Sequence, residues 1–199
     1  MKEMKETPVL LLTGYLGSGK TTLLNRILKN EKGIRFAVIV NDIGEVNIDA
    51  SLIQQGGVVG QGDDSLVALQ NGCICCTLKM DLVKQLNDII NTGSFDYIVI
   101  EASGICEPAP IAQTISTYPQ MIPEKMLKNG KARLDAIVTV VDALRMRDEF
   151  GLGDALQRQD IGEEDLASLV IQQIEFCNII LLNKASEISP EDLKHLKAV

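Results

Sequence analysis

The chain has 199 residues and a formal net charge of −8 at pH 7, and 46% of its residues are hydrophobic although it contains no tryptophan. This length fits one domain with a real core, and an acidic balance without a basic cluster argues against binding to the phosphate backbone of nucleic acids. The apolar runs are too short to cross a bilayer, which takes about 18 to 20 residues, so we expect no membrane partner.

The N-terminal stretch carries lysines and a short apolar run. Acidic residues interrupt its charged part and the apolar part is too short for a signal peptide, so we interpret it as a polar tail before the first strand. The five cysteines are expected to stay reduced, because three of them crowd together in a way that indicates metal binding or reactive thiols before structural disulfides. We therefore expect a cytoplasmic protein.

The first motif follows the apolar run at residues 9–12 and reads Gly14-Tyr15-Leu16-Gly17-Ser18-Gly19-Lys20-Thr21-Thr22. It matches G-x-x-x-x-G-K-[ST] between a strand pattern and a helix pattern, which is the context that a phosphate-binding loop requires. The backbone amides of the last turn should point at phosphate oxygens, at the positive end of the following helix; they belong to Gly17, Ser18, Gly19 and Lys20. Lys20 should reach the β- and γ-phosphates, and the Thr21 hydroxyl should bind Mg²⁺.

Strand and helix patterns alternate along the rest of the chain. Apolar runs predict buried strands at 9–12, 36–40, 97–100, 136–141 and 179–182, with a short further strand at 65–70. Helical spacing and stop signals predict helices at 22–29, 78–92, 111–116, 163–175 and after Ser189, whereas 118–133 shows no clear period and is expected to be a loop. This order predicts an α/β fold, a doubly wound and mostly parallel sheet with helices on both faces, as a single domain over residues 1–199.

Two polar segments follow predicted strands, where ligands bind in open parallel sheets. Glu101 should lie near the Mg²⁺, and the amide of Gly104 near the γ-phosphate. Asn183 and Lys184 should brace the phosphate loop and contact the base. The alternative for Glu101 is an acidic residue that merely ends a strand. The alternative for Asn183 and Lys184 is an ordinary polar turn.

Three cysteines stand within four positions, at Cys73, Cys75 and Cys76. As thiolates they could hold one transition metal, Zn²⁺ or another such as cobalt, with a fourth ligand from elsewhere. A redox pair with C-x-x-C spacing and plain buried thiols are the alternatives. Cys106 and Cys177 are expected to be packing residues and not metal ligands.

Six segments in this order resemble the CobW-like family of P-loop GTPases: GYLGSGKTT, NDIGEVNID, NGCICC, EASGICEP, TVVDA and LLNK. The resemblance implies a domain that binds GTP and GDP, hydrolyses GTP with Mg²⁺ and delivers a transition metal to a client metalloprotein. A homodimer is one of the oligomeric states that we consider. By motif position, Asp42 falls in the switch segment near the Mg²⁺, Glu45 is the candidate fourth ligand of the transition metal, and Glu101 takes the Walker-B-like role. The expected catalytic set is Lys20, Thr21, Asp42, Glu101 and Gly104.

The sequence departs from the family pattern in two ways. The usual Asn-Lys-x-Asp reads Asn183-Lys184-Ala185-Ser186 here, which removes the carboxylate that accepts two hydrogen bonds from guanine. Glu187 could substitute if the loop shifted by one residue. Family members also usually continue into a C-terminal domain, so we expect these residues to represent the N-terminal G-domain. The competing functions are a P-loop ATPase or small-molecule kinase with structural cysteines, and a nucleotide-dependent interaction switch without metal.

Overall fold

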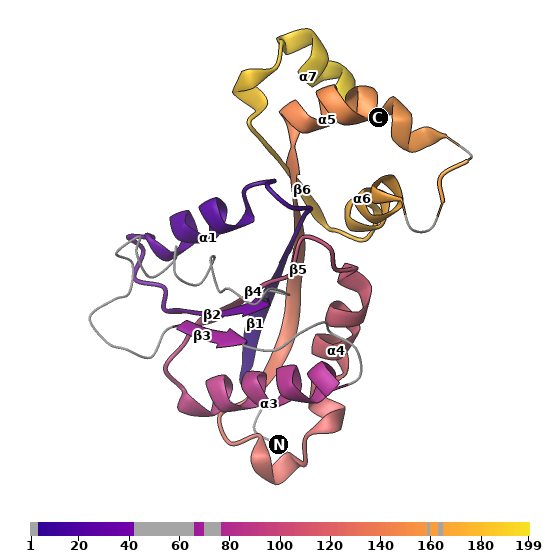
Figure 1. Ribbon diagram of the computed structural model, residues 1–199. Helices are drawn as coiled ribbons and strands as arrows, with labels where there is room; N and C mark the ends of the chain where they lie inside the picture. The colour runs from indigo at the N-terminus through magenta and orange to yellow at the C-terminus, as the bar shows by residue number, and fades with distance from the viewer. Residues whose placement is uncertain (1–3, 42–65, 70–76, 159, 163–164) are drawn as a thin grey trace.

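The structure is a computed structural model that describes residues 4–41, 66–69, 77–158, 160–162 and 165–199 (Figure 1). Within these residues, six strands form one sheet in the order β3-β2-β4-β1-β5-β6, and all neighbouring strands run parallel. The strands are β1 Glu6–Thr13, β2 Phe36–Asn41, β3 Leu66–Leu69, β4 Tyr97–Glu101, β5 Lys131–Asp142 and β6 Ile179–Asn183. The predicted α/β class with a parallel sheet is confirmed, and so is the short strand expected at 65–70.

Helices cover both faces of the sheet (Figure 1). The α-helices are α1 Lys20–Leu28, α3 Thr77–Thr92, α4 Pro108–Met121, α5 Ala143–Phe150, α6 Leu166–Glu175 and α7 Pro190–Leu196, with 3-10 turns η1 Glu124–Met126, η2 Gly151–Gln157 and η3 Ala185–Glu187. Alternate side chains of a strand point to opposite faces. In β1, Val9 and Leu11 therefore pack in the cluster formed with α3 and α4, whereas Leu12 packs against Leu24 of α1.

The strands β1 and β5 are longer than the apolar runs from which they were predicted. They pair from Glu6 and Lys131 onward, with a register shift between Val9 and Leu10. The Glu6 carboxylate lies 3.1 Å from Lys131 Nζ and 3.3 Å from Arg133 Nε. The expected loop at 118–133 is therefore wrong at both ends, since α4 runs to Met121 and β5 begins at Lys131. At the second end, paired charges at this exposed end of the sheet resemble a polar loop in the sequence.

The helix expected at 111–116 is also longer, since α4 begins at Pro108. Proline is tolerated in the first turn of a helix, where the backbone N–H groups have no partner within the helix. Pro108 and Pro110 therefore begin the helix, although the sequence suggested that they would break the chain before it. The helix then runs on through Pro119 to Met121.

The α5 helix was not predicted. Asp142 ends β5 and also caps α5, because its side chain accepts a hydrogen bond from the backbone N–H of Arg145. Ser189 caps α7 in the same manner, by accepting from the N–H of Asp192, as its sequence predicted.

Candidate functional site

The candidate site is built on the loop that joins β1 to α1. Gly14, Gly17 and Gly19 in this loop all have positive φ, at 132°, 77° and 103°. Gly19 is the N-cap of α1 in the left-handed region, and a Cβ at Gly19 would collide with the side-chain amide of Asn183. Glycine is therefore required at this position by both the backbone angle and the neighbouring side chain.

Lys20 begins α1 and folds its side chain back over this loop. Its Nζ donates to the backbone carbonyl of Gly14 at 2.8 Å and to that of Tyr15 at 3.3 Å. The residue is only 8% exposed. A positive charge is thus held inside the curve of a loop that lies at the positive end of a helix, an arrangement that suits anions.

Thr21 and Glu101 meet beside the loop. The Thr21 hydroxyl donates to Glu101 Oε1 over 3.0 Å, and Glu101 is 3% exposed. Pairing of β1 with β4 places Glu101 beside Leu12, close to the start of the loop that leads to Thr21 on α1. A hydroxyl and a buried carboxylate side by side supply the oxygen ligands that Mg²⁺ prefers, so these residues fit that ion.

The turn after β4 packs against the phosphate loop. A Cβ on Gly104 would lie 2.6 Å from the backbone nitrogen of Leu16, so glycine permits this close approach. The backbone N–H of Ala102 donates to the carbonyl of Leu12 at 2.9 Å, which continues the β1–β4 pairing to the start of the turn. Gly104 and the phosphate loop are therefore neighbours.

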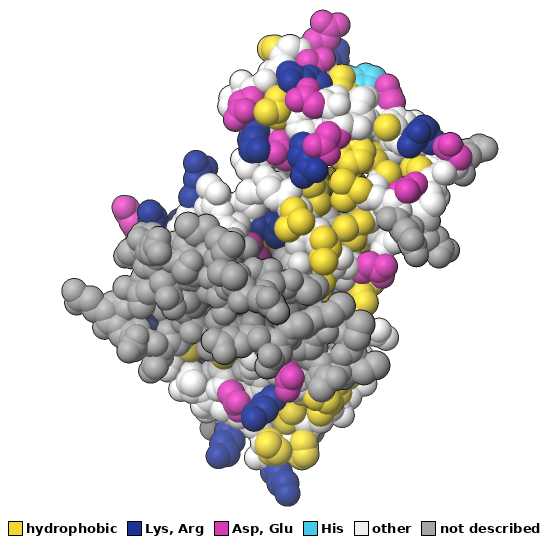
Figure 2. Space-filling view, viewed as in Figure 1, with side chains coloured by type: hydrophobic (Ala, Val, Ile, Leu, Met, Phe, Trp, Pro, Cys, Tyr) yellow, Lys and Arg dark blue, Asp and Glu magenta, His cyan; other side chains and the backbone are white. Residues whose placement is uncertain are grey.

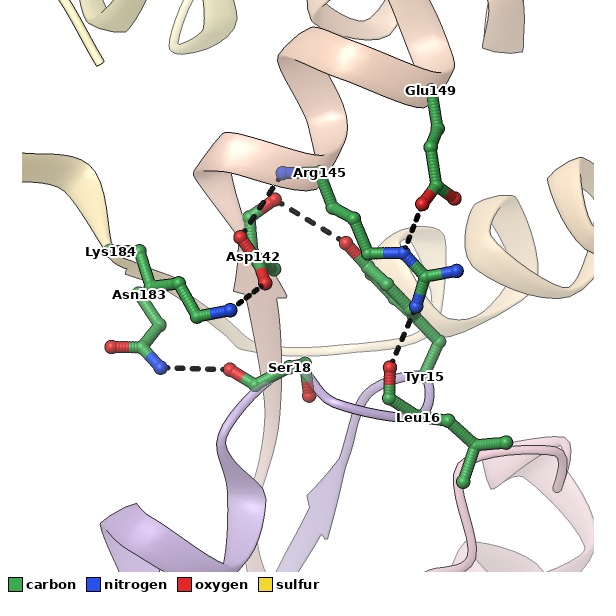
Figure 3. A network of polar contacts seen from close by, with 8 residues as sticks. All are labelled: Tyr15, Leu16, Ser18, Asp142, Arg145, Glu149, Asn183 and Lys184. Atoms are coloured by element: carbon green, nitrogen blue, oxygen red, sulfur yellow. Dashed lines mark hydrogen bonds and ion pairs between the residues drawn. The ribbon is translucent and has the colours of Figure 1, made fainter. Parts of the chain in front are cut away.

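The end of β6 lies on the other side of the loop (Figure 3). Asn183 Nδ2 donates to the backbone carbonyl of Ser18 at 2.8 Å. Lys184 has a positive φ of 55° and forms an ion pair with the buried Asp142. Asn183 therefore contacts the phosphate loop directly, whereas the Lys184 ammonium is held by the end of β5. Thr22, the last residue assigned to the loop, is exposed on α1.

Sequence reasoning missed Arg145, which ties α5 to the phosphate loop (Figure 3). Its Nη1 donates to the carbonyl of Leu16 at 2.9 Å, its Nε pairs with Glu149, and its guanidinium carbon lies 4.9 Å from the Tyr15 ring centroid. Burial raises the pKa of Tyr15 above its ordinary value, so its hydroxyl stays neutral and donates to the carbonyl of Asp142. The spacing of Arg145 and Glu149 in the sequence could have indicated a helical ion pair, but gave no sign of the contact with Leu16.

The residues predicted to hold a transition metal lie outside the described residues. These are Cys73, Cys75, Cys76 and Glu45, and the same holds for the switch residue Asp42. Among the residues that the structure does describe, no group of three or more His, Cys, Asp or Glu side chains could hold a metal ion. Cys177 packs against the core, as expected, and His195 lies 3.2 Å from Asp154.

An apolar groove of about 570 Å³ lies beside β6, at the edge of the sheet. Figure 2 shows hydrophobic side chains gathered on this face, and Ile179 and Ile180 are about half exposed. No residue of the phosphate loop lines the groove, so it is separate from the candidate site. None of the helices described here is long and apolar enough to cross a membrane.

Comparison with known proteins gives one consistent family. The sequence profile of the CobW/HypB/UreG nucleotide-binding domain matches residues 8–199. Zinc-regulated GTPase metalloprotein activator 1 of Dictyostelium discoideum is 38% identical over 211 residues, which cover 100% of this chain and 44% of that protein. The zinc chaperone CobW of Pseudomonas aeruginosa is 32% identical over 210 residues, which cover 100% of this chain and 54% of that protein. The chain thus spans about half the length of these relatives.

Solved structures agree with this result. A Zn(II)-bound triple mutant of the YjiA GTPase matches with a TM-score of 0.57 at 27% identity, covering 96% of this chain and 54% of that one. The hydrogenase maturation factor HypB from Archaeoglobus fulgidus matches with a TM-score of 0.53 at 15% identity, covering 96% and 76%, and supports the fold alone.

Proposed function

This chain belongs to the CobW/HypB/UreG family of nucleotide-binding domains, and from that premise we propose that it is a Mg²⁺-dependent GTP-hydrolysing domain which binds a transition metal and delivers it to a client protein. The observation that carries the nucleotide part is the hydrogen bond from Thr21 to the buried Glu101, beside a loop that encloses the Lys20 ammonium. Phosphate groups and a divalent cation would meet at this point. The relatives that match are named as GTPases or zinc chaperones, which supports the same function.

In the proposed reaction, water attacks the γ-phosphorus of GTP, the bond from that phosphorus to the β–γ bridging oxygen breaks, and the products are GDP, inorganic phosphate and a proton released to solvent. Mg²⁺, when bound, would neutralise charge on the phosphate oxygens. Lys20 and the amides of Gly17, Ser18 and Gly19 would stabilise the developing negative charge, since catalysis of phosphoryl transfer depends mainly on positioning and electrostatics. The backbone N–H of Gly104, in the turn that faces the phosphate loop, would donate a hydrogen bond to the γ-phosphate. No residue is assigned as general base.

The proposed base site lies at the end of β6, where Asn183 and Lys184 follow the last apolar residues. Asn183 is already bonded to the phosphate loop, which supports a position beside the nucleotide. Ser186 lies in η3, where the family usually has an aspartate. We therefore propose weakened selection of guanine, and this is the observation that keeps an ATPase or small-molecule kinase as the second candidate.

The sheet topology supports a transition-metal site close to the nucleotide. Asn41, the last residue of β2, is in register with Leu69, the last residue of β3. The segment that carries Glu45 and the segment that carries Cys73, Cys75 and Cys76 therefore leave the sheet from neighbouring positions. Zinc is the proposed cargo because both relatives are named for it.

One purified sample tests this function. Wild-type protein would be treated with reductant, incubated with Zn²⁺ and desalted, and its bound metal and nucleotide would be measured together. Titration with GTP and ATP, with and without Mg²⁺, would follow, and phosphate release would report hydrolysis. We expect bound zinc, Mg²⁺-dependent binding and slow phosphate release from GTP. Transfer to a small molecule would support the kinase, and nucleotide binding without zinc would support the interaction switch.

A further inference from the structure

Gln173 lies in α6 and is 1% exposed, although it is a polar residue outside the motifs of the site. Its side-chain nitrogen donates to two backbone carbonyls of the turn after β4, that of Cys106 at 3.2 Å and that of Gly104 at 3.4 Å. We propose that Gln173 is a positioning residue that orients this turn toward the terminal phosphate of the bound nucleotide and couples the turn to α6. The inference rests on the proposed function, because it assigns Gly104 to the γ-phosphate.

The turn needs an external restraint at this point. The backbone N–H of Cys106 donates to the carbonyl of Ser103 at 3.1 Å, and this carbonyl shares a peptide plane with the N–H of Gly104. That bond fixes the Ser103–Gly104 plane, and the orientation of the planes after it depends on further partners, since glycine restricts its own backbone little. Gln173 holds the carbonyls of Gly104 and Cys106 on the C-terminal side of this plane. The turn that carries the Gly104 N–H is therefore restrained from α6 as well as from within.

Gln173 is itself anchored to β5, and through β5 to β1, the strand that leads into the phosphate loop. Its backbone carbonyl accepts from the Thr139 hydroxyl of β5 at 2.6 Å. Thr139 Oγ1 lies 3.5 Å from Thr13 Oγ1, and Thr13 is the residue before Gly14. Because a hydroxyl has one proton to donate, Thr13 donates to Thr139 in this arrangement. A buried polar network therefore links the two loops that would surround the phosphates.

The other side-chain atom argues against Gln173 as ordinary packing. Its Oε1 is buried and accepts no hydrogen bond from the residues that the structure describes. A buried amide oxygen without a donor destabilises a fold, so an apolar side chain of similar size would fill this place more favourably. A glutamine at this buried position is explained if its side-chain nitrogen is needed to hold the carbonyls of Gly104 and Cys106.

The test compares affinity for GDP with affinity for a non-hydrolysable GTP analogue, in wild type and in Gln173→Leu. Gln172→Leu is the matched control on the same helix, where the side chain bonds Ser168 and not the turn. In Gln173→Leu we expect analogue affinity and kcat to fall about fivefold to tenfold, as for one or two lost hydrogen bonds, while GDP affinity stays unchanged. The control should match wild type for both nucleotides.

Equal losses for GDP and the analogue would mean a general packing role and would overturn the inference, as would no loss. Should Gln173→Leu fail to fold, Gln173→Met provides a second variant without a hydrogen-bond donor. Wild-type protein gives a further readout, since the analogue should slow amide hydrogen exchange in residues 102–106 and 166–175 more than GDP does. Equal exchange with the two nucleotides would overturn the coupling to α6. Wild-type protein that binds neither nucleotide would instead refute the proposed function, and this inference with it.

Discussion

Asn183, the last residue of β6, donates from Nδ2 to the backbone carbonyl of Ser18 at 2.8 Å. One hydrogen bond thus joins the edge strand of the described sheet to the middle of the phosphate loop. The same amide occupies the space that any side chain at residue 19 would need. The shape of the loop therefore depends on a residue far away in the sequence.

Asn183→Ala should loosen the loop. We expect affinity for GTP and GDP to fall together by about twofold to tenfold, since the net value of one hydrogen bond is about 0.5 to 1.5 kcal/mol. Asn178→Ala is a matched control, because Asn178 Oδ1 accepts from the N–H of Ile137 away from the phosphate loop. The control should lower thermal stability by a similar amount and leave nucleotide affinity unchanged in calorimetric titration. Similar nucleotide affinities in the two variants would contradict a role of Asn183 at the loop.

Lys20→Ala should abolish binding of the triphosphate while the protein still folds. The ammonium would be the main positive charge facing the β- and γ-phosphates. Its loss also removes the hydrogen bonds to Gly14 and Tyr15, so we expect a destabilisation of about 1 kcal/mol in thermal unfolding. Lys29→Ala, at an exposed lysine just after α1, is the control and should bind GTP as wild type does. Wild-type GTP affinity in Lys20→Ala would refute the phosphate-loop assignment.

Glu101→Gln tests the proposed Mg²⁺ site with almost no change of shape. The amide oxygen can still accept from Thr21, but the negative charge that attracts the cation is lost. We expect the Mg²⁺ concentration for half-maximal GTP hydrolysis to rise about tenfold, which corresponds to about 1.4 kcal/mol. Glu107→Gln, an exposed glutamate after the turn, should leave the Mg²⁺ dependence unchanged. An unchanged Mg²⁺ dependence in Glu101→Gln would exclude Glu101 from the site.

Ser186→Asp should restore guanine selection. An aspartate would accept two hydrogen bonds from the N1 and N2 groups of guanine where Ser186 offers one neutral oxygen, and we expect a net gain of about 1.5 to 3 kcal/mol from the charged acceptor. We expect GTP affinity to rise about tenfold to a hundredfold, with ATP affinity unchanged and inosine triphosphate in between. Competition binding against one labelled nucleotide would measure all three. If the variant showed no change, another group, with Glu187 as the first candidate, would already contact the base.

The sequence predicted those parts of the fold that depend on local patterns. The apolar run of β1, the glycines of the phosphate loop and the Ser189-Pro190 helix start each act within a few residues, and the structure shows all of them. The missed features depend on distant partners. Lys131 and Arg133 become part of a strand because Glu6 lies beside them.

Residues with two tasks were the hardest to interpret in the candidate site. Asp142 ends β5, and it also caps α5 and pairs with Lys184. Arg145 looks like a surface charge in the sequence, but it holds a carbonyl of the phosphate loop. Such contacts arise where the carboxyl ends of several strands meet at one edge of a parallel sheet. The pattern of a single sequence does not show which strands are neighbours in the sheet.

The arrangement of strand ends also predicts that metal and nucleotide affinities are coupled. Val40, just before the end of β2, is in register with Glu101, so the segment with Asp42 and Glu45 leaves the sheet beside the proposed Mg²⁺ site. In GTPases such segments are ordered by the γ-phosphate and Mg²⁺ and released on hydrolysis. If Asp42 serves Mg²⁺ and Glu45 serves the cysteine site, ordering the segment must move a ligand of the transition metal.

Zinc affinity should therefore differ between the apo, GDP-bound and GTP-analogue-bound protein, by about 5-fold to 150-fold, and linkage requires zinc to change analogue affinity by the same factor. Chelator competition would measure the zinc affinity in all three states, and calorimetry would measure the reciprocal effect. Glu45→Ala should remove most of the difference, whereas Glu31→Ala, an exposed glutamate before β2, should preserve it. Equal zinc affinities in the three states of wild type would contradict the coupling, because the cysteine site would then not respond to the bound nucleotide. A difference that persists in Glu45→Ala would mean that the coupling exists but passes through another ligand, because the variant removes the Glu45 carboxylate and keeps the three thiolates.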